Sequence, residues 1–169
     1  ADYSVTDIWL SGDDAPTATY DSFVDAVDAE GATIRYAKRD DEIALGDLTF
    51  DVLNPTLPLG DDSNENSIVL LLSFGQIDLL FTGDIGSDTE ASMVAAGLIP
   101  DNEILKVGHH GSKYSSTTTF LNAASPETAV YSASGNQYGH PTPEALTRLD
   151  DAGAIIYGTD IHGTIKVTI

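Results

Sequence analysis

Carboxylate and imidazole side chains follow the predicted ends of three apolar strands in this sequence. Asp84 closes IDLLFTGD, His109 and His110 follow LKVG, and His140 lies in NQYGHP. Side chains at the ends of buried strands are held firmly yet face a crevice, which is where α/β sheets place ligands. Carboxylate and imidazole ligands together suit Zn, Mn or Fe. The pattern therefore indicates metal chemistry at one edge of a sheet.

Each of these residues also has a purely structural interpretation. Asp84 could cap the helix predicted to begin near Ser87, and two adjacent histidines can occur in a solvated turn. Glycines on both sides of the histidine pair favour instead a tight backbone close to an ion or phosphate. His140 fits a structural turn equally well, and His162 is interpreted as a surface turn residue. One aspartate and one histidine pair are too few for a closed metal site, which needs about four protein ligands, or three and a water.

Periodicity places these residues on a series of strands and helices. Ser87 with Glu90 three residues later predicts a capping box at one helix start. The continuous apolar content of 67–73 and 77–82 is typical of strands buried on both faces. The series predicts one α/β domain with a mixed sheet. Strands are predicted at 5–10, 33–36, 42–45, 48–53, 67–73, 77–82, 103–108, 128–132, 154–158 and 164–169, and helices at 19–30, 87–96, 117–124 and 143–152.

The charge of the chain restricts its partners. Its 169 residues include 27 acidic and 7 basic ones, a formal net charge of -20, and such a surface repels nucleic acid and acidic lipid in dilute buffer. At molar salt the Debye length falls to about 3 Å, which removes this objection, and the acidic, lysine-poor composition resembles that of proteins from salt-loving microbes. The lack of cysteine excludes thiolate metal sites. The longest apolar run, 68–72, is too short to span a bilayer, so we expect no direct membrane insertion.

The order of the motifs is more specific than any one of them. GD, then KVGHHGS, then NQYGHP, then TDIHGTI resembles the second half of the metallo-β-lactamase fold. More narrowly, it is similar to the hydrolase-like domain attached to ComEC-type competence (DNA internalisation) proteins, over essentially the whole chain. The resemblance implies a four-layer αββα architecture. Residues 1–169 would form its C-terminal majority, a single domain truncated at its N-terminus.

The resemblance also implies roles for individual residues. Asp84 matches an aspartate that bridges two metal ions, Zn or Mn, and His110 matches the last histidine ligand, unless the turn is read one residue differently and His109 is the ligand. Asn64 and Asn66 lie near where many family members carry a further histidine ligand. The other motif positions imply proton transfer or phosphate binding: His140, His109 and Tyr138 for catalysis, and Lys106, Ser112 and Asn66 for substrate binding.

The family's principal metal motif, of the form H-x-H-x-D-H, has no counterpart here, since residues 1–105 contain no histidine. We therefore expect a piece of a longer protein whose upstream segment supplies that motif. A shortened, metal-free relative is the alternative. The expected partners are that upstream segment or a membrane channel domain of the same protein and, at high salt, a nucleic acid.

The implied function is part of a metal-dependent hydrolase, a phosphodiesterase or nuclease linked to DNA uptake. In isolation the chain should hold little or no metal and be inactive, because Asp84 and His110 alone bind a transition metal weakly. The alternative is a non-catalytic accessory domain of a competence-type membrane protein. β-Lactamase activity is supported only by the resemblance to the superfamily, and a fold does not determine a function.

Overall fold

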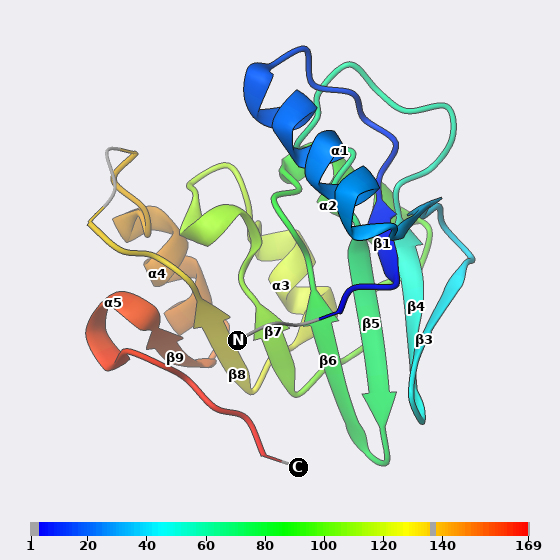
Figure 1. Ribbon diagram of the computed structural model, residues 1–169. Helices are drawn as coiled ribbons and strands as arrows, with labels where there is room; N and C mark the ends of the chain where they lie inside the picture. The colour runs from blue at the N-terminus through cyan, green and yellow to red at the C-terminus, as the bar shows by residue number, and fades with distance from the viewer. Residues whose placement is uncertain (1–3, 136–137, 169) are drawn as a thin grey trace.

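The computed structural model of the chain describes residues 4–135 and 138–168. Strands and helices alternate at both ends of the chain, and a run of strands lies between residues 33 and 81 (Figure 1). The strands are β1 (Asp7–Leu10), β2 (Thr33–Tyr36), β3 (Glu42–Leu45), β4 (Leu48–Asn54), β5 (Val69–Phe74), β6 (Ile77–Phe81), β7 (Ile104–Lys106), β8 (Thr128–Tyr131) and β9 (Ile155–Gly158). The helices are α1 (Ala18–Glu30), α2 (Ser87–Ala95), α3 (Thr118–Ala124), α4 (Pro143–Asp151) and α5 (Thr159–His162), with a 3-10 turn, η1, at Gly108–Gly111.

One large sheet of seven strands runs in the order β3-β4-β5-β6-β7-β8-β9. The strands from β3 to β6 pair antiparallel, and those from β6 to β9 pair parallel. Parallel neighbours need crossover connections, and α2, α3 and α4 lie in the three that join β6 to β9. The carboxyl ends of β6, β7 and β8 therefore meet at one edge, and the predicted α/β class with a mixed sheet is confirmed.

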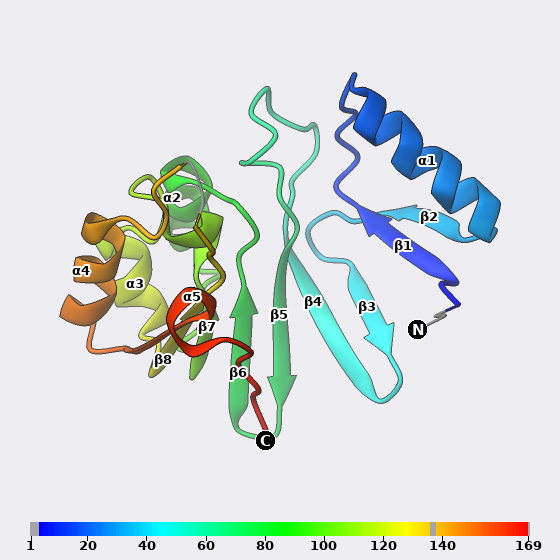
Figure 2. The ribbon, with the colours of Figure 1, turned by 60° about the vertical axis from the view of Figure 1, so that its left-hand side comes forward.

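A small βαβ unit precedes this sheet. β1 and β2 form a separate parallel pair, and α1 makes the crossover between them (Figure 2). The Thr17 hydroxyl accepts a hydrogen bond from the Tyr20 amide at the start of α1, and Gly31, with φ of 74°, ends the helix. Among the described residues no helix is long and apolar enough to cross a membrane.

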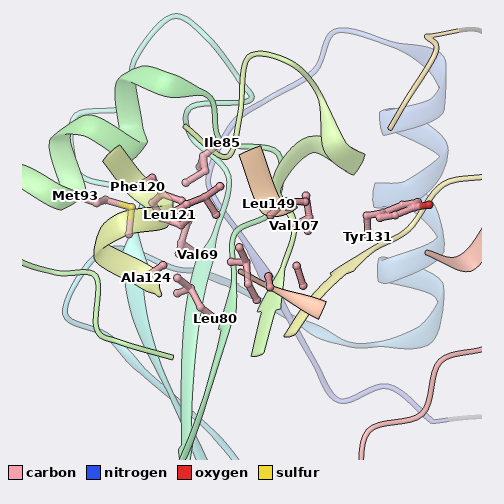
Figure 3. Packing of buried hydrophobic residues seen from close by; sticks show 13 residues of the cluster. Val69, Leu80, Ile85, Met93, Val107, Phe120, Leu121, Ala124, Tyr131 and Leu149 are labelled. Atoms are coloured by element: carbon pink, nitrogen blue, oxygen red, sulfur yellow. The ribbon is translucent and has the colours of Figure 1, made fainter. Parts of the chain in front are cut away.

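Helices α2, α3 and α4 cover one face of the large sheet. Leu80, Leu105 and Ala129 form a row across β6, β7 and β8 and are fully buried. Each leucine contributes about 1.5–3 kcal/mol through burial of its side chain. This row is the centre of the hydrophobic core, to which the helices add Met93, Phe120, Leu121, Ala124 and Leu149 (Figure 3).

The opposite face of the same sheet is apolar and only partly covered: Val52, Leu72 and Leu79 are buried there, whereas other side chains are exposed. Successive side chains of a strand point to opposite faces, so Ile104 and Ile155, which flank the buried row in register, point away from the helices. Ile155 is exposed, as are Phe74 and Leu45 on the same side. We call the less buried part of this surface the open face; it comprises Leu45, Phe74, Ile77, Phe81, Ile104, Val130, Ile155 and Tyr157.

Three sequence-based expectations are corrected by the structure. The second face of β5 and β6 is buried only at Leu72 and Leu79, whereas Leu70 and Phe81 on the same face are half-buried. The strand predicted at 103–108 ends at Lys106, and η1 follows it. Residues 164–168 form no strand; their alternating apolar residues mimic one, but they pair with no sheet edge among the described residues, and the short helix α5 precedes them.

The predicted capping box at the start of α2 is also wrong. The N-cap is Gly86, without a side-chain hydrogen bond, rather than Ser87. The carboxylate of Glu90 accepts hydrogen bonds from the backbone amides of Ser116 and Thr117 instead. Two amide donors from a neighbouring loop outcompete the single donor that a capping box offers.

Candidate functional site

The turn after β6 carries Asp84. Gly83 adopts a φ of 55°, and a Cβ there would lie 2.8 Å from the Ser67 Cβ, so this position requires glycine. The Asp84 amide donates to the Ser67 hydroxyl at 3.1 Å, and the Thr82 hydroxyl donates to the Lys106 carbonyl at 2.8 Å. These bonds fix the turn to both neighbouring strands, and the Asp84 carboxylate remains partly exposed. Because α2 is capped by Gly86, the interpretation of Asp84 as a helix cap is wrong.

The turn after β7 carries the histidine pair in a strained backbone. His109 and His110 have φ values of 47° and 55°, so two consecutive non-glycine residues lie in the left-handed region. Each such residue costs on the order of 1–2 kcal/mol. The His109 amide donates to the Gly83 carbonyl at 3.0 Å, which ties this turn to the Asp84 turn. The strain is thus held at the place where the two turns meet.

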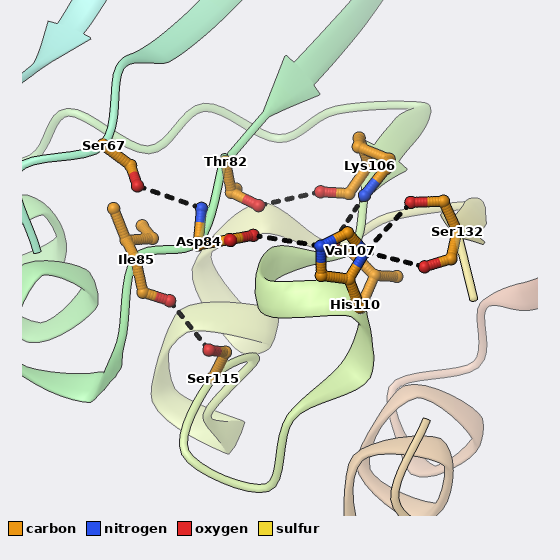
Figure 4. Close-up of polar contacts among 9 residues, drawn as sticks. All are labelled: Ser67, Thr82, Asp84, Ile85, Lys106, Val107, His110, Ser115 and Ser132. Atoms are coloured by element: carbon orange, nitrogen blue, oxygen red, sulfur yellow. Dashed lines mark hydrogen bonds and ion pairs between the residues drawn. The ribbon is translucent and has the colours of Figure 1, made fainter. Parts of the chain in front are cut away.

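Asp84 and His110 face one another across these turns. Asp84 Oδ1 lies 3.7 Å from His110 Nε2. His110 Nδ1 lies 2.8 Å from the Ser132 carbonyl and 3.2 Å from its hydroxyl, at the end of β8 (Figure 4). A carbonyl can only accept, so Nδ1 carries a proton, and Nε2 is the ring nitrogen that faces Asp84. This is how a metal-binding histidine is usually oriented, by a hydrogen bond from its other ring nitrogen.

Lys106 ends β7 on the open-face side of the sheet, between Phe81 and Val130 in register. Its ammonium donates to the Val107 carbonyl at 3.0 Å. Burial lowers the pKa of Lys106, and the nearby Asp84 carboxylate opposes that shift. The lysine therefore places a partly desolvated positive charge next to the Asp84 turn, where it can bind an oxyanion.

His140 lies beside His109. The two rings stand edge to face with centroids 5.4 Å apart, and the Tyr138 ring centroid is 6.2 Å from that of His140. Burial lowers the pKa of His140, and the charges of His109 and His110 lower it further. Its neutral form therefore predominates near pH 7, which suits proton transfer.

Two hollows flank the segment of Tyr138 and His140. One, of about 430 Å³, is lined by His110, Ser132 and Thr159 as well as by both of these residues. The other, of about 520 Å³, is lined by His109, Ser112 and Tyr114 together with them. The site therefore extends to both sides of Tyr138 and His140.

The remaining predicted residues are divided between the site and other positions. Ser112 is buried, lines the second hollow and accepts from the Tyr114 amide at 3.3 Å. Asn66 is not brought to the site: its amide bonds to Gly60 and to Asp13 Oδ2, and it lines a different pocket. Asn64 is exposed in the same loop. His162 is exposed at the end of α5, as interpreted from the sequence, and Asn136 and Gln137 of the NQYGHP motif lie outside the described residues.

Three residues with a part in the site were missed by the sequence analysis. Ser132 orients His110, and Glu90 and Arg148 hold the loop that follows the histidine pair. No local pattern marks them, because each acts on a residue 22 to 32 positions away. Within residues 4–135 and 138–168, no cluster of three or more His, Cys, Asp or Glu side chains is placed to hold a metal ion.

Comparison with known proteins places the chain near competence proteins. No model of a protein family matches the sequence. The chain is 36% identical over 138 residues to ComE operon protein 3 of Bacillus subtilis, which covers 81% of this chain and 18% of that protein. It is 39% identical over 121 residues to Competence protein ComA of Neisseria gonorrhoeae (70% and 18%) and 29% identical over 121 residues to Recombination protein 2 of Haemophilus influenzae (71% and 15%). The chain thus spans less than a fifth of these relatives, and the similarity supports a ComEC-type competence family.

Proposed function

We propose that this chain is part of a metal-dependent hydrolase of the metallo-β-lactamase superfamily, a phosphodiesterase or nuclease that acts in DNA uptake. Its similarity to segments of ComE operon protein 3 and Competence protein ComA supports the competence role. The motif order supports the superfamily. One observation carries the chemical part of the proposal: Asp84 Oδ1 and His110 Nε2 face each other at 3.7 Å.

That pair fits a metal ion. A carboxylate oxygen and an imidazole nitrogen are donors that Zn and Mn accept, and the Ser132 carbonyl holds His110 in the tautomer that ligation needs. When bound, the metal would supply an activated hydroxide and stabilise charge on a phosphoryl oxygen. We assign the ligand role to His110 rather than His109, because His109 packs against His140.

The chain's other residues have roles around that ion. Lys106 binds a phosphate oxygen beside Asp84, since its ammonium is partly desolvated there. His140 donates a proton to the leaving-group oxygen, and the Tyr138 ring lies beside the His140 ring. Ser112 lines the hollow in which one side of the substrate lies.

Two ligands are not a complete site, and the open face suggests where the others come from. Exposed apolar patches on a domain often mark surfaces on which another segment packs. We propose that a further segment, carrying histidine ligands, packs on the open face and brings those ligands to Asp84 and His110. A membrane channel domain of the same protein is the expected neighbour of the completed hydrolase.

Metal analysis of the longer protein that includes such a segment tests the assignment. Asp84→Ala and His110→Ala should each reduce bound Zn or Mn and abolish metal-dependent cleavage of DNA, whereas His162→Ala should change neither. Metal content that is unchanged in both site variants would refute the ligand assignment. Full metal content without cleavage of any phosphodiester would refute the hydrolase.

A non-catalytic accessory domain is the second candidate. The observation in its favour is that the described residues hold no group of three metal-binding side chains. On this alternative, the longer protein would bind no stoichiometric metal, and DNA uptake would survive Asp84→Ala.

A further inference from the structure

Two exposed tyrosines rim the hollow on the His109 side of the site. Tyr114 is 67% exposed and Tyr138 is 73% exposed, and both line the hollow of about 520 Å³ with His109 and His140. Exposed aromatic rings gain little from packing on their own protein, and they offer flat apolar surfaces to a ligand. Their place beside the proposed site is therefore informative.

The loop that presents Tyr114 is held rigidly from two sides. The Glu90 carboxylate, in a side chain only 1% exposed, accepts from the amides of Ser116 and Thr117. The Arg148 guanidinium donates to the carbonyls of Lys113, Ser115 and Ser116 at 3.0, 2.7 and 2.8 Å. A buried anion on the amide side and a cation on the carbonyl side fix the loop backbone, so the exposed ring is carried on a preorganised support.

The charge of the hollow differs from that of the protein. The chain has nearly four acidic residues for each basic one, yet the hollow is lined by Lys113, two histidines and a single carboxylate, Glu144. Lys113 Nζ lies 5.0 Å from the Tyr114 ring centroid. A cation beside an exposed ring suits a ligand that has both an anionic group and a flat π face.

We propose that Tyr114 and Tyr138 form a subsite for an unpaired nucleobase next to the scissile phosphate, so that the site selects single-stranded over duplex nucleic acid. This inference rests on the proposed phosphodiesterase function. A base in a duplex is stacked on its neighbours and hides its face, whereas a base in a single strand is free to stack on an aromatic side chain. Stacking is also insensitive to salt, unlike phosphate contacts. It therefore suits a protein of net charge -20 whose long-range field repels polyanions.

Fluorescence anisotropy with the chain itself tests the subsite without any hydrolysis. The probe is a fluorescein-labelled oligothymidylate of about ten nucleotides, measured in EDTA at molar salt. Tyr114→Ala should raise Kd roughly 5- to 150-fold, Tyr138→Ala should weaken binding in the same direction, and Tyr114→Phe should bind as the parent does. Tyr36→Ala is the matched control, because Tyr36 is 62% exposed and lines a different pocket.

Two further probes decide whether the base is what the subsite binds. An abasic strand of equal length and a hairpin duplex should both bind more weakly than the oligothymidylate. Equal affinity for the abasic strand, no effect of either tyrosine-to-alanine change, or no binding of any probe would overturn the subsite. Because these measurements need no metal, loss of cleavage with intact base-dependent binding would count against the hydrolase alone.

Discussion

The two faces of the seven-stranded sheet are made by the same strands, yet their apolar side chains are buried to different extents. On the covered face, Leu80 and Leu105 are 0% exposed beneath α2, α3 and α4. On the open face, Leu45 is 66% exposed and Ile155 is exposed on a strand whose next residue, Ile156, packs on the core. The covered face therefore supplies much of the stability of this chain. The opposite face is buried at its centre, where Val52, Leu72 and Leu79 are 1%, 8% and 9% exposed, and leaves apolar side chains exposed on β3, on β9 and at the end of β5.

The largest expected difference comes from one leucine on each face. Leu80→Ala should lower the free energy of unfolding by about 2–5 kcal/mol, because it removes buried methyl groups and leaves a cavity. Leu45→Ala, the same change in an exposed strand residue, should stay within about 0.5 kcal/mol. Urea denaturation monitored by circular dichroism measures both. Equal losses for the two variants would show that the faces do not differ as described.

Glu90 is a buried polar group at the margin of the covered face, and its loss is the next largest effect. Glu90→Gln leaves one of the two backbone amides of Ser116 and Thr117 facing an NH2 group, which should cost about 1–3 kcal/mol at neutral pH. Thermal or urea unfolding of the two proteins in parallel gives this difference.

The pH dependence of that difference has a defined sign. Burial raises the pKa of Glu90 in the folded state, so the folded chain binds a proton more readily than the unfolded chain. The resulting stabilisation of the wild type is fully present below the unfolded pKa of about 4.5 and disappears as the pH rises through the higher folded pKa. The gap between the wild type and Glu90→Gln should therefore widen as the pH falls through the folded pKa; a gap that narrows over this range would contradict the assignment.

A substitution that relieves the strained histidine turn should raise stability, whereas the core substitution lowers it. His109→Gly places glycine at a φ of 47° and should raise stability by about 1 kcal/mol, a Tm increase of roughly 2–4 °C for a domain of this size. Ser125→Gly, at a φ of 44° at the end of α3, is the control and should give a similar gain. In the longer hydrolase proposed above, only the His109 variant should reduce cleavage; equal cleavage in both would remove His109 from the site.

The smallest effect on stability is expected on the open face itself. Phe74→Ser with Ile155→Thr should change the free energy of unfolding by no more than about 1 kcal/mol in total, because both side chains are exposed. The same double variant should bind clearly less of an apolar fluorescent dye, since it removes exposed hydrophobic surface. Dye binding that stays at the wild-type level would mean that this surface is not accessible in solution.

Much of the fold could be predicted because its signals are local. The strand Thr33–Tyr36 and the hairpin of β3 and β4 appear with boundaries within one residue of the expected ones, since turn glycines and alternating side chains define them. The helix ending at Gly31 is equally well marked. Burial is less predictable, because continuous apolar runs do not say how much of a second face is covered: Leu72 and Leu79 are buried on that face, whereas Leu70 and Phe81 are half-buried.

The site could be predicted only where a motif marks it. Asp84 and the histidine pair follow apolar strands, and the structure brings Asp84 and His110 within 3.7 Å. No motif marks Ser132, Glu90 or Arg148, because each acts on a loop that is distant in the sequence. Asn66 was assigned by position within a motif, but its amide is occupied by the loop that it stabilises.

The reversal of strand direction at β6 also affects the order in which this chain can assemble. From β3 to β6 each strand pairs with its sequence neighbour. Tight turns join β3 to β4 and β5 to β6, whereas residues 55–68 join β4 to β5. From β6 to β9 each pair of neighbouring strands is separated in the sequence by a crossover helix that must also pack on the sheet. Contacts between such distant residues form slowly. Asp84 thus follows the antiparallel strands, whose pairing we expect to form early. His110 follows a parallel strand, whose pairing forms later, so we expect the two side chains to meet only late in folding.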